Sequence, residues 1–329
     1  MIDFDKLPKI DLHVHVDGSV RPSTVVELLN NPYPDKVAKL MRVDKDTISH
    51  AEYMRKFDLP TRVMQSKSNL TRIAMELAED LKADGVIYAE AHLSPARHTQ
   101  EGLAMSDVIK AVLAGFKKVD GIKVNLILCM QREDNENDNR RIIRLAKLYH
   151  RQGVCGVGLV GNEKKYPNRT FGNLFKYAKS QNVNFTVHAG EEDGADSVKG
   201  AIDLGVKRIG HGVRVIENEY IESLLKEKNI ALEVCPNSNI DVGIYSNYKD
   251  HPVKKLYDYG IKVTIGSNCR TVSNITLTTE YQNLYRYLGF SLEDFVKMNE
   301  YAIDASFMSD NDKKKYRKLL KESIFKEEK

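Results

Sequence analysis

Short apolar runs alternate with longer stretches of helical periodicity along most of the chain. The short runs are rich in Val, Ile and Leu and are bounded by glycine, asparagine or charged residues, which is typical of strands buried in a parallel sheet. Eight such runs predict strands at residues 7–19, 85–93, 122–130, 154–161, 184–188, 208–211, 231–235 and 262–266.

Helical periodicity follows each of these runs. Helices are expected at residues 105–119, 138–150, 171–179, 196–204, 220–228 and 251–259, and three more begin near Thr276, Ser291 and Asp310. Strands that alternate with helices pair in parallel, and eight such repeats close into a barrel. The predicted fold is therefore α/β, a (β/α)8 TIM barrel with extra C-terminal helices, and residues 1–329 are expected to form a single domain.

The stretch between the first and second strands, residues 21–83, is helical throughout. Breaks near residues 30–32 and 58–60 divide it into several pieces, and Pro22 suits the first turn of a helix. A helical insertion of this length is large enough to cover a site at the strand ends. An apolar gate, or equally well plain packing, is the interpretation for Phe57, Leu59 and Met64.

The composition changes this picture little. The chain is 42% hydrophobic and 29% charged, as in ordinary soluble globular proteins, and its net charge is +4. Most of the excess lysine lies in helical stretches and near the C-terminus, which is typical of solvated faces. No basic stripe alternates with aromatic residues, so a nucleic-acid partner is not expected.

The four cysteines are scattered, without a C-x-x-C pair, and most lie in apolar runs that favour buried free thiols: Cys129, Cys155, Cys235 and Cys269. We find no hydrophobic core of a signal peptide and no apolar stretch of about 20 residues. The sequence therefore predicts a cytoplasmic protein with reduced thiols and no membrane partner.

Residues that could bind a metal or take part in catalysis lie at the ends of predicted strands. His13 and His15 are two residues apart in the first strand, so both imidazoles point to the same face. His188 ends the fifth strand and His211 ends the sixth. The C-terminal strand ends of a barrel form one rim, so the four histidines are expected to converge on a metal site there. The alternative for the first pair is two ordinary histidines on a solvated strand.

An acidic residue, Glu191, follows the fifth strand after Ala189 and Gly190. The glycine lets the backbone approach a ligand closely, and the carboxyl group that follows is well placed for proton transfer. In a dry pocket its pKa would be raised. The alternative is a surface carboxylate, as we expect for Glu192 and Asp193.

Four motifs in this order resemble the adenosine deaminase family of metal-dependent amidohydrolases, from Leu7 to about Ser306. They are Leu12-His-Val-His-Val-Asp-Gly18, Val187-His-Ala-Gly-Glu191, Arg208-Ile-Gly-His-Gly212 and Val234-Cys-Pro-Asn-Ser-Asn239. The other zinc deaminase signature, H-x-E with P-C-x-x-C, is absent from the chain.

The resemblance implies a role for several positions. It implies one Zn²⁺ ion bound by His13, His15 and His188, and a purine nucleoside as the small-molecule substrate. Glu191 matches the acid that protonates purine N1 while hydroxide attacks C6, and His211 matches the imidazole that orients or deprotonates the attacking water. Gly161 matches the glycine whose backbone faces purine N3, and Asp17 matches the residue near the ribose 5′-hydroxyl.

The chain departs from the family pattern after the eighth strand. Asn268 stands where the metal-binding aspartate of the family belongs, and Cys269 stands where the residue that hydrogen-bonds purine N7 belongs. An amide is a weaker zinc ligand than a carboxylate and cannot accept a proton. A Cys269 thiolate is an alternative ligand, but adjacent residues point to opposite faces. Two further departures are Asn162 in the fourth strand region and His92, where an arginine is usual.

These observations leave three interpretations open. The preferred one is zinc-dependent hydrolytic deamination of adenosine or a related 6-aminopurine nucleoside. The second is a pseudoenzyme that binds a purine nucleoside and has lost or changed its reaction, which Asn268 and Cys269 favour. The third is hydrolysis of a different leaving group at purine C6.

Overall fold

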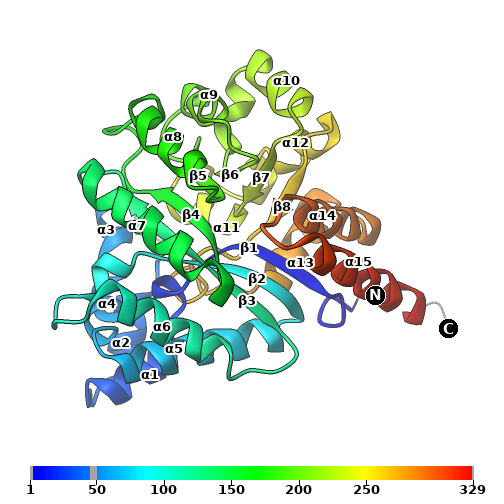
Figure 1. The fold of residues 1–329 in the computed structure, drawn as a ribbon. Coiled ribbons are helices and arrows are strands. Elements are labelled where there is room, and N and C mark those ends of the chain that lie inside the picture. The colour runs from blue at the N-terminus through cyan, green and yellow to red at the C-terminus, as the bar shows by residue number, and fades with distance from the viewer. Residues whose placement is uncertain (1–2, 45–49, 328–329) are drawn as a thin grey trace.

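The computed structural model describes residues 3–44 and 50–327, and its centre is one sheet of eight parallel strands (Figure 1). Each strand pairs with the next along the chain. The strands are Lys9–His15 (β1), Val86–Leu93 (β2), Lys123–Gln131 (β3), Val154–Val160 (β4), Phe185–Ala189 (β5), Arg208–His211 (β6), Ala231–Val234 (β7) and Val263–Ile265 (β8). All eight predicted strands are confirmed. The first is shorter than predicted because Asp17–Ser19 turns into a 3-10 helix.

The sheet closes on itself between its first and last strands. Val14 forms a parallel bridge with Asn268, which lies beyond the end of β8. The N–H of His15 donates to the carbonyl of Asn268 at 2.8 Å, and the N–H of Asn268 donates to the carbonyl of His13 at 2.7 Å. The predicted barrel is therefore confirmed, and a residue singled out for metal binding also takes part in its closure.

Helices surround the strands, as Figure 1 shows. The predicted insertion forms five of them: Pro22–Leu28 (α1), Pro34–Met41 (α2), His50–Arg55 (α3), Asp58–Val63 (α4) and Lys67–Ala83 (α5). The break predicted at residues 58–60 is instead the beginning of α4. Pro60 is tolerated because it lies in the first turn, where its missing N–H has no intrahelical partner to lose.

The helices between and after the later strands agree with the predictions, except for Pro236–Asp241, a short helix after β7 that the sequence pattern does not predict. They are Met105–Phe116 (α6), Glu136–Tyr149 (α7), Gly172–Ser180 (α8), Ala195–Leu204 (α9), Glu219–Glu227 (α10), Pro236–Asp241 (α11), Val253–Tyr259 (α12), Leu277–Leu288 (α13), Leu292–Ala305 (α14) and Asp310–Glu327 (α15). Capping hydrogen bonds fix the residues at which several of these helices begin. Ser66 and Asn135 accept N-terminal N–H groups of α5 and α7, and Ser291 forms a capping box with Asp294.

The core has an apolar outer layer and a polar interior. A large apolar cluster fills the space between strands and helices, and Ile10 and Leu12 face outward against the C-terminal Tyr316 and Leu320. The side chains inside the barrel are unusually polar for buried positions. Among them are Asp11, His13, Glu90, His92, Thr186, Arg208 and Glu233. So many buried polar groups require partners or a ligand.

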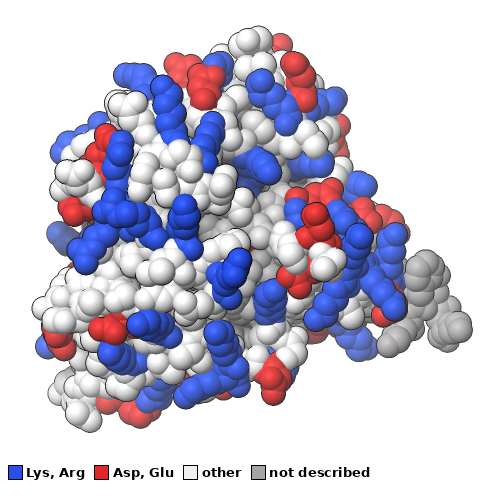
Figure 2. Space-filling model, viewed as in Figure 1, with Lys and Arg blue, Asp and Glu red and all other residues white. Residues whose placement is uncertain are grey.

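The surface carries charges of both signs. On the face in Figure 2, lysine and arginine side chains are spread over the outer helices, with acidic side chains between them. None of the helices in the described ranges is long and apolar enough to span a bilayer. The four cysteines are buried and free, as predicted.

Candidate active site

A cavity of about 400 Å³ opens at the C-terminal ends of the strands. Such a volume falls within the range of roughly 300–1,000 Å³ that small-molecule sites occupy. The predicted residues His15, Asp17, Gly161, His188, Glu191, His211, Asn268 and Cys269 all line it. His13 is fully buried beneath its floor.

The four predicted histidines converge below this cavity. The ring centre of His13 lies 5.4 Å from that of His15, 4.6 Å from His188 and 4.9 Å from His211. Ring nitrogens of His13, His188 and His211 all lie within 4.8 Å of one another. A second compact group joins His13 to His92 and Glu233, and neither group includes His15.

Hydrogen bonds decide which ring nitrogens can bind a cation. The Nδ1–H of His13 donates to the Glu233 carboxylate at 2.7 Å, and both side chains are fully buried. This contact leaves the Nε2 of His13 buried without a hydrogen-bond partner, and Nδ1 of His188 is in the same situation. Unpartnered nitrogen atoms in a buried imidazole cluster are the donor set that zinc prefers, so these residues fit the ion that the sequence implies.

The imidazoles around His13 are held neutral by their surroundings. Burial lowers the pKa of His15 to about 3 and lowers the pKa values of His188 and His211 well below the ordinary value. A neutral imidazole keeps a lone pair on one ring nitrogen, which a metal requires.

Close packing fixes the two central rings. Gly210, in β6, lies directly beneath them, and a Cβ atom at this position would be 2.8 Å from Cε1 of His13 and 3.1 Å from Nδ1 of His188. Glycine is therefore needed here for space, because a methyl group would displace both imidazoles.

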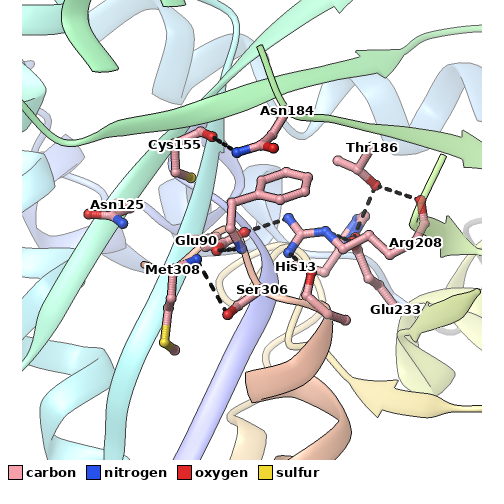
Figure 3. A network of polar contacts seen from close by, with 12 residues as sticks. His13, Glu90, Asn125, Cys155, Asn184, Thr186, Arg208, Glu233, Ser306 and Met308 are labelled. Atoms are coloured by element: carbon pink, nitrogen blue, oxygen red, sulfur yellow. Dashed lines mark hydrogen bonds and ion pairs between the residues drawn. The ribbon is translucent and has the colours of Figure 1, made fainter. Parts of the chain in front are cut away.

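A network of buried charges supports His13 from below (Figure 3). Arg208 lies 2.5 Å from Glu233 through its Nε atom and 2.5 Å from Glu90 through Nη2, and all three side chains are fully buried. The Glu90 carboxylate also accepts the N–H of Phe307, at 2.7 Å. The ring of Phe307 lies 3.9 Å from the Arg208 guanidinium carbon. Glu233 and Arg208 thus connect His13, a predicted metal ligand, to the N-terminal end of the barrel.

The loop after β5 presents Glu191 to the cavity. The buried carboxylate of Glu163 holds this loop by accepting the N–H groups of Gly190, Glu191 and Asp193 at 3.0, 2.8 and 2.6 Å. Oε2 of Glu191 lies 3.3 Å from Nε2 of His211. Burial, with smaller contributions from Glu163 and Glu192, raises the pKa of Glu191 well above its ordinary value. The raised pKa favours the protonated carboxyl group, so Glu191 can act as an acid.

His211 adopts a backbone conformation that few residues tolerate. Its φ is +64°, in the left-handed region that favours glycine. Its ring is buried, and Nδ1 lies 3.2 Å from the amide nitrogen of Asn239. Backbone strain of this kind persists where the surrounding structure fixes it, and it is common at functional sites.

Asn268 is held by neighbours other than the histidines. Its Nδ2 donates to Oγ of Ser238 at 2.6 Å, and its Oδ1 lies 3.7 Å from Sγ of Cys269. Burial raises the pKa of the Cys269 thiol far above its ordinary value, which opposes the thiolate alternative. The amide oxygen of Asn268 remains the predicted ligand atom, but it has the Cys269 thiol beside it.

A model of the family described as adenosine deaminase matches residues 8–323. A curated adenosine deaminase of Clostridium acetobutylicum is 39% identical over 315 residues, which cover 92% of this chain and 94% of that protein. The chain belongs to the adenosine deaminase family.

Solved structures share the fold of this adenosine deaminase family member. Arabidopsis ADAL, solved in complex with IMP, has a TM-score of 0.88 and 28% identity, and the match covers 98% of each chain. An adenine deaminase from Arthrobacter aurescens has a TM-score of 0.88 and 24% identity, covering 96% of this chain and 99% of that one. At that identity the second likeness shows the fold alone.

The remaining predicted residues of this family member lie at the cavity wall. Gly161 has a φ of +104°, which requires glycine, and Glu133 beside it accepts the N–H of Asn162 at 2.9 Å. Burial raises the pKa of Asp17 to about 6. Of the predicted gate, Phe57 lines the cavity with Tyr53, Met54 and Thr61 of the inserted helices. The gate is corrected in part: Met64 is fully buried and Leu59 packs against the core.

Several residues that support the site carried no functional prediction. Glu233 is a charged residue inside an otherwise apolar strand, and this unusual position could have indicated a buried functional role. Glu163 follows the predicted fourth strand and carried no prediction. Ser238 and Asn239 were quoted in the resemblance without a role, and His251 was not singled out. Their partners are far away in the chain, so local patterns could not reveal them.

Proposed function

We propose that this protein is a zinc-dependent aminohydrolase that converts adenosine or a related 6-aminopurine nucleoside to the 6-oxo product and ammonia. The observation that carries the proposal is the position of Glu191. Its carboxyl group, whose pKa is raised by burial, lies at the cavity wall, 3.3 Å from His211 and above the imidazole cluster, so an acid and a metal site face the same space.

Each residue has a separate task in this reaction. His13, His15 and His188 would hold the zinc ion, with Asn268 as a weaker fourth ligand. A zinc ion held there would supply Lewis acidity and lower the pKa of a water molecule. Glu191 donates its proton to purine N1, and the water oxygen forms the new bond to C6. The two water protons leave this oxygen, one for the departing amino group and one for the Glu191 carboxylate, as the C6–N bond breaks and ammonia leaves. His211 orients the attacking oxygen.

The charges of the cavity favour a nucleoside over a nucleotide. The lining contains the carboxyl groups of Asp17, Glu133, Glu163, Glu191 and Glu192. Among the described lining residues, Arg97 is the single lysine or arginine, and its Nη2 lies 3.5 Å from Oε1 of Gln131. A 5′-phosphate would meet more negative than positive charge here, so we expect adenosine to be a better substrate than AMP.

The direct test is conversion of adenosine to inosine by zinc-loaded protein, followed by ultraviolet absorbance, with AMP and adenine as competing substrates. We expect turnover of adenosine with a higher kcat/KM than for AMP. Binding of adenosine without turnover would contradict the proposal. Turnover of a purine with another group at C6, but not of adenosine, would favour the different leaving group.

The second candidate function is nucleoside binding without efficient catalysis. The observation that favours it is the side chain of Asn268, which donates to Ser238 and has the Cys269 thiol near its oxygen. Asn268→Asp separates the two functions. If the asparagine limits the enzyme, this variant gains zinc affinity and turnover. If turnover is already efficient and does not change, the asparagine is tolerated and the pseudoenzyme is excluded.

A further inference from the structure

Three buried side chains form a line that ends at His211. They are Asn239, in α11, His251, which lies between α11 and α12, and His211 itself, and all are at most 3% exposed. Nε2 of His251 lies 3.2 Å from Oδ1 of Asn239, and Nδ2 of Asn239 lies 3.2 Å from Nδ1 of His211. Because water does not reach these atoms, each contact must match a donor to an acceptor.

A backbone group fixes the direction of the whole line. The N–H of Val253 donates to Nδ1 of His251 at 3.2 Å. A backbone N–H is always a donor, so this Nδ1 carries no proton and the proton of the neutral ring is on Nε2. Burial lowers the pKa of His251 to about 3, so the ring does not gain a second proton at neutral pH.

The remaining donors and acceptors then follow. Nε2–H of His251 donates to the Asn239 carbonyl oxygen, which places the NH₂ group of Asn239 toward His211. That NH₂ group is a donor, so Nδ1 of His211 must be the acceptor. The single proton of neutral His211 is therefore on Nε2, the nitrogen that lies 3.3 Å from Oε2 of Glu191.

We propose that His251 and Asn239 are positioning residues that fix His211 as its Nε2–H tautomer. In that tautomer His211 donates a hydrogen bond from Nε2 and cannot accept a proton there. The catalytic consequence of this tautomer rests on the proposed function. The tautomer decides whether His211 orients the attacking water or accepts its proton. His211 orients the attacking oxygen by donating to it, and the water proton goes to the Glu191 carboxylate, which has given its own proton to purine N1.

Asn239→Asp tests the inference because it changes the polarity without changing the shape. The aspartate accepts on both oxygens, so Nδ1 of His211 must become the donor and its Nε2 loses the proton. Nitrogen NMR of protein labelled with ¹⁵N-histidine distinguishes protonated from unprotonated ring nitrogens. We expect His211 to be protonated on Nε2 in the wild type and on Nδ1 in Asn239→Asp.

The kinetic comparison uses two substitutions of His251. His251→Leu removes the donor, and we expect kcat to fall by roughly tenfold or more, since a catalytic histidine in the wrong tautomer can cost up to about 10⁴-fold. His251→Gln keeps an amide donor at this position, and we expect it to recover part of kcat, with little change in KM for either variant. A purely structural role would instead lower thermal stability in both variants without the kcat difference.

The outcomes separate this inference from the proposed function. His211 protonated on Nδ1 in the wild type would overturn the inference even if adenosine is turned over. The predicted tautomers in a protein that turns over no purine would refute the proposed function and leave the hydrogen-bond assignment standing. If Asn239→Asp fails to fold, the wild-type spectrum still decides the tautomer.

Discussion

The two ends of the barrel treat buried polar atoms in opposite ways. At the N-terminal end, the buried Lys9 ammonium donates to the carbonyls of Phe4, Leu7 and Asp84, and Arg208 lies between two carboxylates. At the C-terminal end, ring nitrogens of His13 and His188 have no hydrogen-bond partner. Nε and Nη2 of Arg208 and Oε2 of Glu90 also lack a hydrogen bond, but each of them lies 2.5 Å from an atom of opposite charge. Paired charges stabilise a fold, whereas unpartnered ring nitrogens leave room for a ligand. The difference indicates which end of the barrel performs chemistry.

One strained residue lies at the rim. Among the described non-glycine residues with positive φ, five are asparagines, which adopt this conformation more readily than most residues, and the sixth is His211. The rim thus combines strain, raised or lowered pKa values and unpartnered nitrogens. Substitutions at the rim should change activity at nearly constant stability, and substitutions at the other end should do the reverse.

The largest effect is expected for Glu191→Gln. Glutamine keeps the shape but cannot give a proton to N1, so kcat should fall by about 10²–10⁴-fold. Initial-rate kinetics with adenosine and a urea unfolding curve measure the two properties, and the midpoint of unfolding should not move. Comparable turnover in the variant would remove Glu191 from the mechanism.

Arg208→Met should lower the stability of the fold, in contrast to Glu191→Gln, which should lower activity. It leaves the buried carboxylates of Glu90 and Glu233 without their cation, which should lower the free energy of unfolding by about 3–5 kcal/mol. The matched control is Arg140→Met, because Arg140 pairs with Glu136 on the surface, where such pairs contribute about 0–1 kcal/mol. Equal urea stabilities of the two variants would contradict the division between the ends.

Gly210→Ala should weaken zinc binding by roughly 10–100-fold, as disturbed support of a ligand typically does. The new methyl group would press on His13 and His188. Gly172→Ala is the control, since no atom lies within 4 Å of a Cβ atom there. Competition with a chromophoric chelator measures the affinity, and equal affinities would show that the rings can move without cost.

The smallest expected effect is a shift of the pH profile in Glu192→Gln. Glu191 acts when protonated, so activity is present below its pKa and is lost as pH rises through it. The Glu192 carboxylate helps to raise that pKa. Its removal should therefore move the alkaline decline of kcat/KM to lower pH, while Glu219→Gln on α10 should leave the decline in place. A shift to higher pH would show that the sign is wrong.

The sequence by itself determined the barrel and the place of its site. Strand and helix periods are local properties, so the eight strands, most helices between the later strands and the three closing helices could be predicted within a few residues. The insertion was predicted to be helical, but not the bounds of its five helices. The rule that parallel strands end on one rim then brought together residues as distant as His13 and His211. The acid Glu191 followed from its position directly after a strand.

Only the tertiary structure decided what each of these groups can do. The free nitrogen of His13 depends on Glu233, which is 220 positions away, and the proton of His211 depends on Val253 through His251 and Asn239. The side chain of Asn268 is fixed by its hydrogen bond to Ser238, which follows β7. Tautomers, lone pairs and pKa values are set by neighbours in space, and the periodicity of a chain carries no information about them.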